Sequence, residues 1–209
     1  MREQSFAEWW ATEGSLRPTA LAAWTDAHWQ LLLGQSPLVR QPQTAWYAQA
    51  LTEALAAVLW QAPGYWLHVA VQDGCLAQQV RDYCQDATLQ ALRWCSLRLD
   101  RALTATRLPG VPLVVLGPPY VRHWRSLLSY EAFVPVPPRH AFWCAEDLVA
   151  WTSAAVEAQN RRAMVWVIAE WIGPWLVDQL WQRFSGRAWV IDAQPWLEQK
   201  QLIYSVEDP

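Results

Sequence analysis

Two short apolar runs near the end of this chain, separated by one helix-length segment, constrain its fold more than any other feature. The first run, Ala163–Ala169, leads into Glu170, and the second, Arg187–Ile191, ends on Asp192. Apolar runs without polar alternation are typical of parallel strands that are covered on both faces. The segment between them, about residues 175–184, is amphipathic and predicts a crossover helix. The pattern therefore favours an α/β fold.

Four further apolar runs extend this pattern toward the start of the chain. We predict an α/β, Rossmann-like fold with a mostly parallel sheet of about six strands flanked by helices. The four additional strands are expected at residues 65–71, 92–97, 112–116 and 132–136. Residues 1–209 are expected to form a single domain, with a helical N-terminal portion at 1–62, the sheet and its helices at 63–197, and a tail at 198–209.

Within the N-terminal portion, helices are expected over residues 5–13, 18–33 and 44–60. Leu21, Trp24 and His28 fall on one face of the second segment, and Gly34 is its predicted stop. Ala and Leu favour helix in the third segment, and Thr44 is its expected cap.

Composition excludes several classes of protein. The chain has 209 residues, is 53% hydrophobic and carries a formal net charge of −3, so it is neither disordered nor built with a basic stripe for extended nucleic-acid binding. The four cysteines lack C-x-x-C spacing, which favours buried free thiols in a reducing compartment. No run approaches the roughly 20 apolar residues that span a bilayer, and residues 1–5 lack the basic segment and apolar core typical of a signal peptide. We expect a cytoplasmic protein without a membrane partner.

Polar residues and glycines follow the predicted strands, where parallel sheets bind their ligands. Glu170, Asp192 and Asp73 each come directly after a strand and suit sugar hydroxyls or metal-bound phosphates, although the same positions suit turns and helix caps. Gly117 and Gly173 each precede a proline between strand and helix. Backbone amides at such a corner can receive a phosphate, or the glycine can simply permit a tight turn.

A third kind of candidate lies near the N-terminus, where Asp26 and His28 are two residues apart. In a loop both side chains can reach one divalent metal ion, whereas on a regular helix they point to different sides. The second case favours a helix cap and a partly buried histidine. The chain has no Walker loop, G-x-G-x-x-G turn, G-x-S-x-G elbow or H-E-x-x-H pair, which disfavours hydrolase and zinc-enzyme classes.

Seventeen tryptophans are a several-fold enrichment over the roughly 1% of an average protein. Two sets suit either a stacking surface for a sugar or base or, as their spacing favours, the core: Trp9 and Trp10, and the series Trp166, Trp171, Trp175 and Trp181.

The order of these pieces resembles the GT-D glycosyltransferases, a Rossmann-like family that takes sugar from a nucleotide donor. The resemblance covers about residues 20–197 and rests on arrangement. It is carried by these segments: Thr25–Gly34 in the place of the family's Asp-Gly-Glu element, Ala62–Val69, Val114–Pro118, Phe133–Pro137, Gly173-Pro174 and Val190–Asp192.

The resemblance implies a nucleotide-sugar donor, a hydroxyl acceptor and a divalent metal, Mn²⁺ or Mg²⁺. It implies that Asp26 and His28 hold the metal or diphosphate, that Gly117, Gly173 and Glu170 border the donor, and that Asp73 or Asp192 positions sugar or acts as base. The chain departs from the family where Ala27 and His28 replace Gly and Glu. Histidine removes a negative charge and suits Mg²⁺ poorly, so an altered metal site, a metal-independent enzyme and an inactive relative all remain open.

Two alternatives compete with a glycosyltransferase. A non-catalytic α/β scaffold that binds a partner through a Trp-rich surface predicts a homo-oligomer or a co-purifying partner. A phosphate-binding or nucleic-acid-modifying enzyme predicts salt-sensitive binding through a local arginine patch made of Arg93, Arg98, Arg101 and Arg107.

Overall fold

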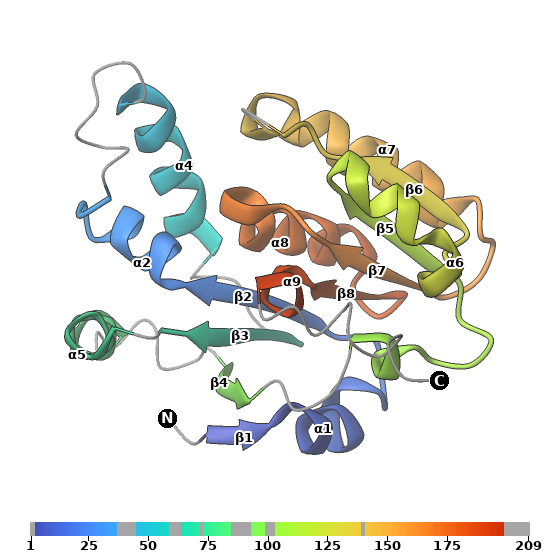
Figure 1. Ribbon diagram of the computed structural model, residues 1–209, viewed down its shortest axis with the longest axis horizontal. Coiled ribbons are helices and arrows are strands. Elements are labelled where there is room, and N and C mark those ends of the chain that lie inside the picture. Colours follow the sequence, from blue (N-terminus) through green and yellow to red (C-terminus); the bar gives the residue numbers. More distant parts are fainter. Residues whose placement is uncertain are drawn as a thin grey trace.

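The computed structural model describes residues 3–36, 45–58, 64–71, 73–84, 93–98, 103–138 and 141–198. Within them, one all-parallel sheet has eight strands in the order β1-β4-β3-β2-β8-β7-β5-β6 (Figure 1). The predicted α/β fold class is confirmed. The strands are β1 (Glu3–Ser5), β2 (Ala20–Thr25), β3 (Tyr65–Ala70), β4 (Arg93–Arg98), β5 (Leu113–Gly117), β6 (Ala132–Pro135), β7 (Ala163–Val167) and β8 (Ala188–Asp192).

Helices cover both faces of the sheet, and the apolar residues of each strand alternate between two buried clusters. In β7, Val165 and Val167 face the first cluster, and Trp166 faces the second. The first cluster is covered by α2 (Asp26–Leu32), α4 (Ala45–Val58), α5 (Gly74–Cys84), α7 (Ala145–Glu157) and α8 (Gly173–Phe184). The second is covered by α1 (Phe6–Trp9), η4 (Pro119–Trp124), α6 (Arg125–Leu128) and α9 (Gln194–Glu198).

Short helical turns make up the remaining elements of the described residues. They are η1 (Trp10–Gly14), η3 (Leu103–Thr106), η5 (Ala141–Cys144) and η6 (Glu170–Ile172). No helix in the described ranges is both long and apolar enough to cross a membrane.

The prediction of a helix over residues 18–33 was wrong in its first part. Residues 20–25 form β2, an inner strand that pairs with β3 on one side and β8 on the other. Ala and Leu favour helices, but that preference amounts to less than about 1 kcal/mol per residue and yields to burial on both faces of a sheet. Helix α2 begins only at Asp26 and ends at Leu32, with Gly34 at a φ of +70° as the predicted stop. The remaining helix predictions agree approximately, and α9 was not predicted.

Some predictions fall outside the described residues. They include the cap at Thr44, residues 59–60 of the third predicted helix, Arg101 of the arginine patch, and the tail from residue 199 onward. Among the cysteines that the structure describes, the prediction of buried thiols was wrong for Cys75, which is exposed.

Three of the six tryptophans of the two predicted sets lie in the core, as their spacing favoured, and the other three pack against it. Trp9 and Trp166 are fully buried, and Trp181 is 5% exposed. Trp10, Trp171 and Trp175 are partly buried and pack against the clusters.

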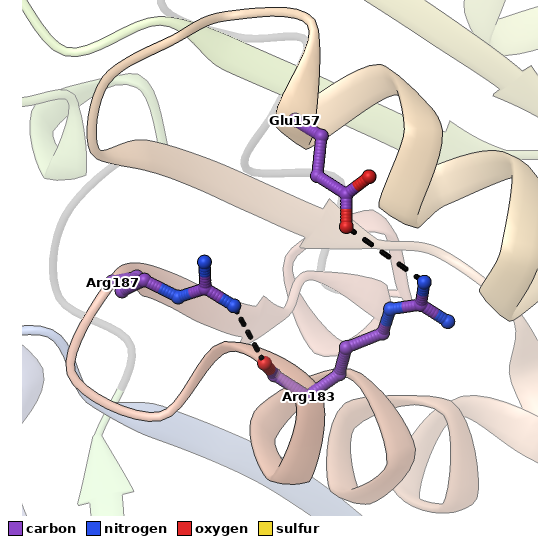
Figure 2. Close-up of polar contacts among 3 residues, drawn as sticks. All are labelled: Glu157, Arg183 and Arg187. Carbon is purple, nitrogen blue, oxygen red and sulfur yellow. Dashed lines mark hydrogen bonds and ion pairs between the residues drawn. The ribbon is translucent and has the colours of Figure 1, made fainter.

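The amino-terminal edge of the sheet carries mainly exposed polar contacts. Helices α7 and α8 end there, and a 3.7 Å ion pair joins Glu157 of α7 to Arg183 of α8 (Figure 2). Arg187 donates a 3.2 Å hydrogen bond to the backbone oxygen of Arg183. Because both ion-pair side chains are about half exposed, water screens the pair and it contributes roughly 0–1 kcal/mol.

Gly64 permits the turn that enters β3. Its φ is +87°, and a Cβ at this position would lie 2.7 Å from Cζ2 of Trp181. Gly64→Ala is therefore expected to lower the free energy of unfolding by about 2 kcal/mol or more, since strain and a clash add. Gly186→Ala is the matched control, because Gly186 has a φ of +76° with nothing within 4 Å of the added Cβ. If urea denaturation gave the same loss of unfolding free energy for Gly64→Ala and Gly186→Ala, the clash with Trp181 would be refuted.

Asp178 of α8 is 2% exposed, and burial raises its pKa from 3.8 to about 6. Amide groups of Gln182 and Gln179 donate to its Oδ2 at 2.7 and 3.2 Å. A carboxyl whose folded pKa is raised stabilises the fold below its unfolded pKa and loses that contribution as pH rises through the folded value.

Asp178→Asn is thus expected to increase the free energy of unfolding at about pH 8 by on the order of 2 kcal/mol, because no charge is then buried. The gain should vanish near pH 4, where both proteins are neutral at this position. Urea titrations at the two pH values measure this difference, and Asp147→Asn, at an exposed position of α7, is the control. A loss of stability at about pH 8 would contradict the expectation.

Candidate functional site

A crevice opens at the carboxyl ends of the strands, between β5 and β7. The chain leaves β5 through η4 and α6 toward the second cluster, whereas it leaves the neighbouring β7 through α8 toward the first. Opposite exits from adjacent parallel strands leave a gap above the sheet, and α/β proteins bind ligands in such gaps. The walls come from the segments that follow β5 (Pro118, Tyr120), β6 (Val136–Pro138) and β7 (Ile168–Ile172), with Tyr47 of α4 and Gln194 of α9.

A second hollow adjoins the first at the neighbouring strand ends. Thr25, Ala27 and His28 at the start of α2 line it, and it shares Glu170, Trp171 and Gln194 with the first hollow. The two hollows therefore form one crevice across the ends of β2, β8, β7 and β5, and Glu170 lies where they meet.

His28 connects the two sides of the crevice. Its Nδ1 lies 3.1 Å from the backbone N–H of Thr25 and 3.0 Å from the Thr25 hydroxyl, and its Nε2 lies 3.1 Å from the backbone oxygen of Glu170. A backbone N–H only donates and a carbonyl only accepts, so Nδ1 is the acceptor and Nε2 carries the proton. The ring ties the β2–α2 corner to the β7–α8 corner.

Burial keeps this imidazole neutral. His28 is 4% exposed, and desolvation lowers its pKa from 6.5 to about 4, although the backbone oxygens of Glu170 and Trp171 act in the opposite direction. A proton added at Nδ1 would face the Thr25 N–H, which is itself a donor. Both ring nitrogens are thus engaged within the protein.

Glu170 is held in an unusual backbone conformation. Its φ is +33°, in the left-handed region that costs a non-glycine residue about 1 kcal/mol or more. Its carbonyl accepts from both His28 Nε2 and the N–H of Gly173, which fixes the peptide despite the strain. The side chain is exposed in the crevice. Burial and then the charge of Glu170 raise the pKa of the Tyr120 phenol on the facing wall.

Asp192 lies beneath the crevice as a buried link. Its Oδ2 accepts from the N–H of Ala23 in β2 at 3.3 Å, and its Oδ1 accepts from the N–H of Gln194 at 3.1 Å. A Cβ on Gly173 would lie 2.9 Å from Oδ2, so the first residue of α8 must be glycine for this contact. The side chain is 1% exposed and joins β8, β2 and two helix starts.

The other predicted site residues have local roles in the structure. Asp73 is exposed and caps α5, since its Oδ1 accepts from the N–H groups of Cys75 and Leu76 at 2.7 and 3.2 Å. It follows β3, which lies beyond β2 from the crevice. Gly117 ends β5 where a Cβ would lie 3.2 Å from Cβ of Ile168. Asp26 is partly buried at the first position of α2, next to the second hollow.

The described residues do not fit a divalent metal at the position that the resemblance implies. Both nitrogens of His28 make hydrogen bonds within the protein, and no group of three or more His, Cys, Asp or Glu side chains converges anywhere in the described ranges. A Mg²⁺ or Mn²⁺ site requires several oxygen ligands at one point.

Several crevice residues were not singled out from the sequence. Tyr120 and Gln194 lie within three positions of the end of a strand, the signal that did identify Glu170. Trp171 was named only as one of the tryptophan series that suited a stacking surface or the core. Tyr47 gives no such signal, because it comes from α4 and meets the crevice only through the fold.

Comparisons with solved structures show the same fold. One, described as a domain of unknown function 1792 with a distinct glycosyltransferase fold, shares 15% identity over 88% of this chain and 77% of its own, with a TM-score of 0.54. A second, described as a new glycosyltransferase (DUF1792) from Streptococcus sanguinis, shares 12% identity over 97% of this chain and 86% of its own, with a TM-score of 0.53. A third, a selenomethionine-substituted structure of the domain of unknown function 1792, shares 14% identity over 88% of this chain and 77% of its own, with a TM-score of 0.55. No protein-family profile and no curated protein matches the chain in sequence.

The neutral state of His28 predicts how stability depends on pH. Its folded pKa lies below the unfolded value, so its contribution is complete above pH 6.5 and is lost as pH falls toward 4. The wild type should lose about 3 kcal/mol more over this interval than His28→Asn, whose side chain does not titrate. Urea unfolding at stepped pH measures the difference, and His123→Asn, at an exposed histidine of η4, is the control. Parallel curves for wild type and His28→Asn would contradict a neutral buried ring.

Proposed function

We propose that this chain is a glycosyltransferase-like enzyme that binds a nucleotide-sugar donor in the crevice and transfers the sugar to a hydroxyl acceptor. The fold shared with DUF1792 structures supports a glycosyltransferase-like protein. Sequence identities of 12–15% show a common fold and not a common activity. The position of the crevice at a point where adjacent strands exit to opposite faces supports ligand binding there.

The single observation that carries the proposal is the placement of Glu170. Its carboxylate is exposed where the two hollows meet, on a strained peptide that His28 and Gly173 hold from below. Strain of this kind persists where surrounding structure fixes it, and it concentrates at functional sites. The backbone of Glu170 is thus held at one position, from which its exposed carboxylate can accept a proton in the crevice.

In the proposed reaction, Glu170 is the general base. It accepts the proton of the acceptor hydroxyl as that oxygen forms a bond to the anomeric carbon of the donor. The bond between the anomeric carbon and the diphosphate oxygen breaks, and its electron pair leaves with the nucleoside diphosphate. Asp192 and His28 are positioning residues, because their polar atoms form hydrogen bonds with backbone groups that shape the crevice.

A second candidate function is binding without transfer. It is favoured by His28, which occupies the place of the family's glutamate and whose ring is fully engaged by Thr25 and Glu170. A scaffold of this kind would bind ligand in the crevice with Glu170 as a hydrogen-bond acceptor only. Turnover separates the two candidates.

Glu170→Gln tests the role of the carboxylate. The wild type should be stabilised against heat by at least one of a set of UDP- and TDP-sugars, and should release the nucleoside diphosphate slowly when the set is incubated with it. The variant should keep the thermal stabilisation and lose about 10²-fold or more of the release rate, as for loss of a general base. Glu146→Gln, on the exposed first turn of α7, should retain both.

Three results would count against the proposal. No thermal stabilisation by any nucleotide-sugar would exclude a donor site, and an unchanged release rate in Glu170→Gln would exclude the base. Stabilisation without release by the wild type would favour the non-catalytic candidate.

A further inference from the structure

Aromatic rings gather beside the crevice, next to its lining residue Tyr47. Trp46 of α4 and Trp143 of η5 are 50% and 62% exposed, with ring centroids 4.2 Å apart and planes at 53°. Tyr47, which lines the crevice, lies 6.0 Å from the Trp46 ring and 6.0 Å from Phe142. We call these four residues the aromatic wall. It is continuous with the crevice through Tyr47 and through Ala141, which precedes Phe142.

The exposure of this wall is unusual for the molecule. Among described residues, the large apolar side chains with high exposure are Leu16, Trp46, Tyr120, Trp143 and Trp151. Tyr120 lines the crevice, and Trp46 and Trp143 lie next to it, beside the lining residues Tyr47 and Ala141. Most other tryptophans of the described ranges are buried or partly buried. Trp46 and Trp143 are as apolar as those residues, so their exposure sets them apart.

The chemistry of the walls selects a class of ligand. Among the described residues that line the two hollows, Glu170 is a carboxylate, Gln194 an amide and Tyr120 a phenol, while no Lys or Arg contributes and His28 is neutral. Without Lys or Arg, the diphosphate of the proposed donor would be held by backbone N–H groups at the strand-to-helix corners, and the side chains of the walls suit a neutral ligand. A neutral sugar instead offers C–H groups to the negative face of an aromatic ring and hydroxyl groups to carboxylate and amide.

We propose that the aromatic wall is the acceptor subsite and that its ligand is a neutral saccharide. One pyranose ring of the ligand packs on the exposed faces of Trp46 and Trp143, and the next extends past Tyr47 to bring a hydroxyl to Glu170. The acceptor role rests on the proposed function. Saccharide binding at the aromatic wall is measured independently of it.

The test uses cellobiose, lactose and maltose as probes with the full chain. Saturation-transfer NMR should show contact from one face of a pyranose ring for at least one probe, and calorimetry should give its affinity. Trp143→Leu should weaken that affinity about tenfold, because leucine keeps the apolar contact and removes the π face. Trp143→Phe should keep most of the affinity. Trp151→Ala, an equally exposed tryptophan on α7, should leave it unchanged.

Each alternative outcome overturns part of the inference. No binding of any probe, or equal affinity in wild type and Trp143→Leu, excludes a saccharide site at the wall. Equal loss in Trp151→Ala excludes a specific one, provided that circular dichroism shows every variant folded. Displacement of the probe by UDP alone assigns the wall to the donor. Saccharide binding without nucleotide-sugar turnover would retain the site and reject the transferase, so the two failures are distinguishable.

Discussion

The hydrogen-bonded ring of His28 is the interaction on which the geometry of the crevice depends. It spans from the Thr25 N–H to the Glu170 carbonyl and so joins two strand-to-helix corners that are separated by β8. Without its donor at Nε2, the Glu170 carbonyl would keep only the N–H of Gly173, and the peptide at φ +33° would have less to hold it. A histidine does this only while neutral, which burial secures at physiological pH.

This role changes the meaning of the resemblance to GT-D enzymes. Where that family's motif supplies a second acid, this chain supplies a buried neutral ring that faces protein on both sides. The negative charge that remains in the crevice is on Glu170, which follows a different strand. A transferase built this way would rely on a fixed base and on ring stacking. The aromatic wall could supply the stacking, and the described lining residues include no Lys or Arg that would bind an anion instead.

Sequence reasoning located the strands whose burial is visible as unbroken apolar runs, and with them Glu170, Gly117 and Gly173. It failed at β2, because an Ala-rich segment looks helical until the strands that flank it are known. It also could not separate chemistry from architecture for Asp192, whose oxygens both serve backbone N–H groups contributed by distant or following residues. The place of Tyr47 in the crevice could not be predicted either, because only the packing of α4 brings this residue to the strand ends.

The state of the His28 ring tests this account most directly. Nitrogen NMR of the imidazole, recorded as a function of pH on the folded protein, reports which nitrogen carries the proton and where the ring becomes charged. The account predicts the Nε2–H form throughout the neutral range, with protonation only near pH 4. An Nδ1–H form, or a ring that becomes charged near its ordinary pKa of 6.5, would show that His28 does not bridge Thr25 and Glu170.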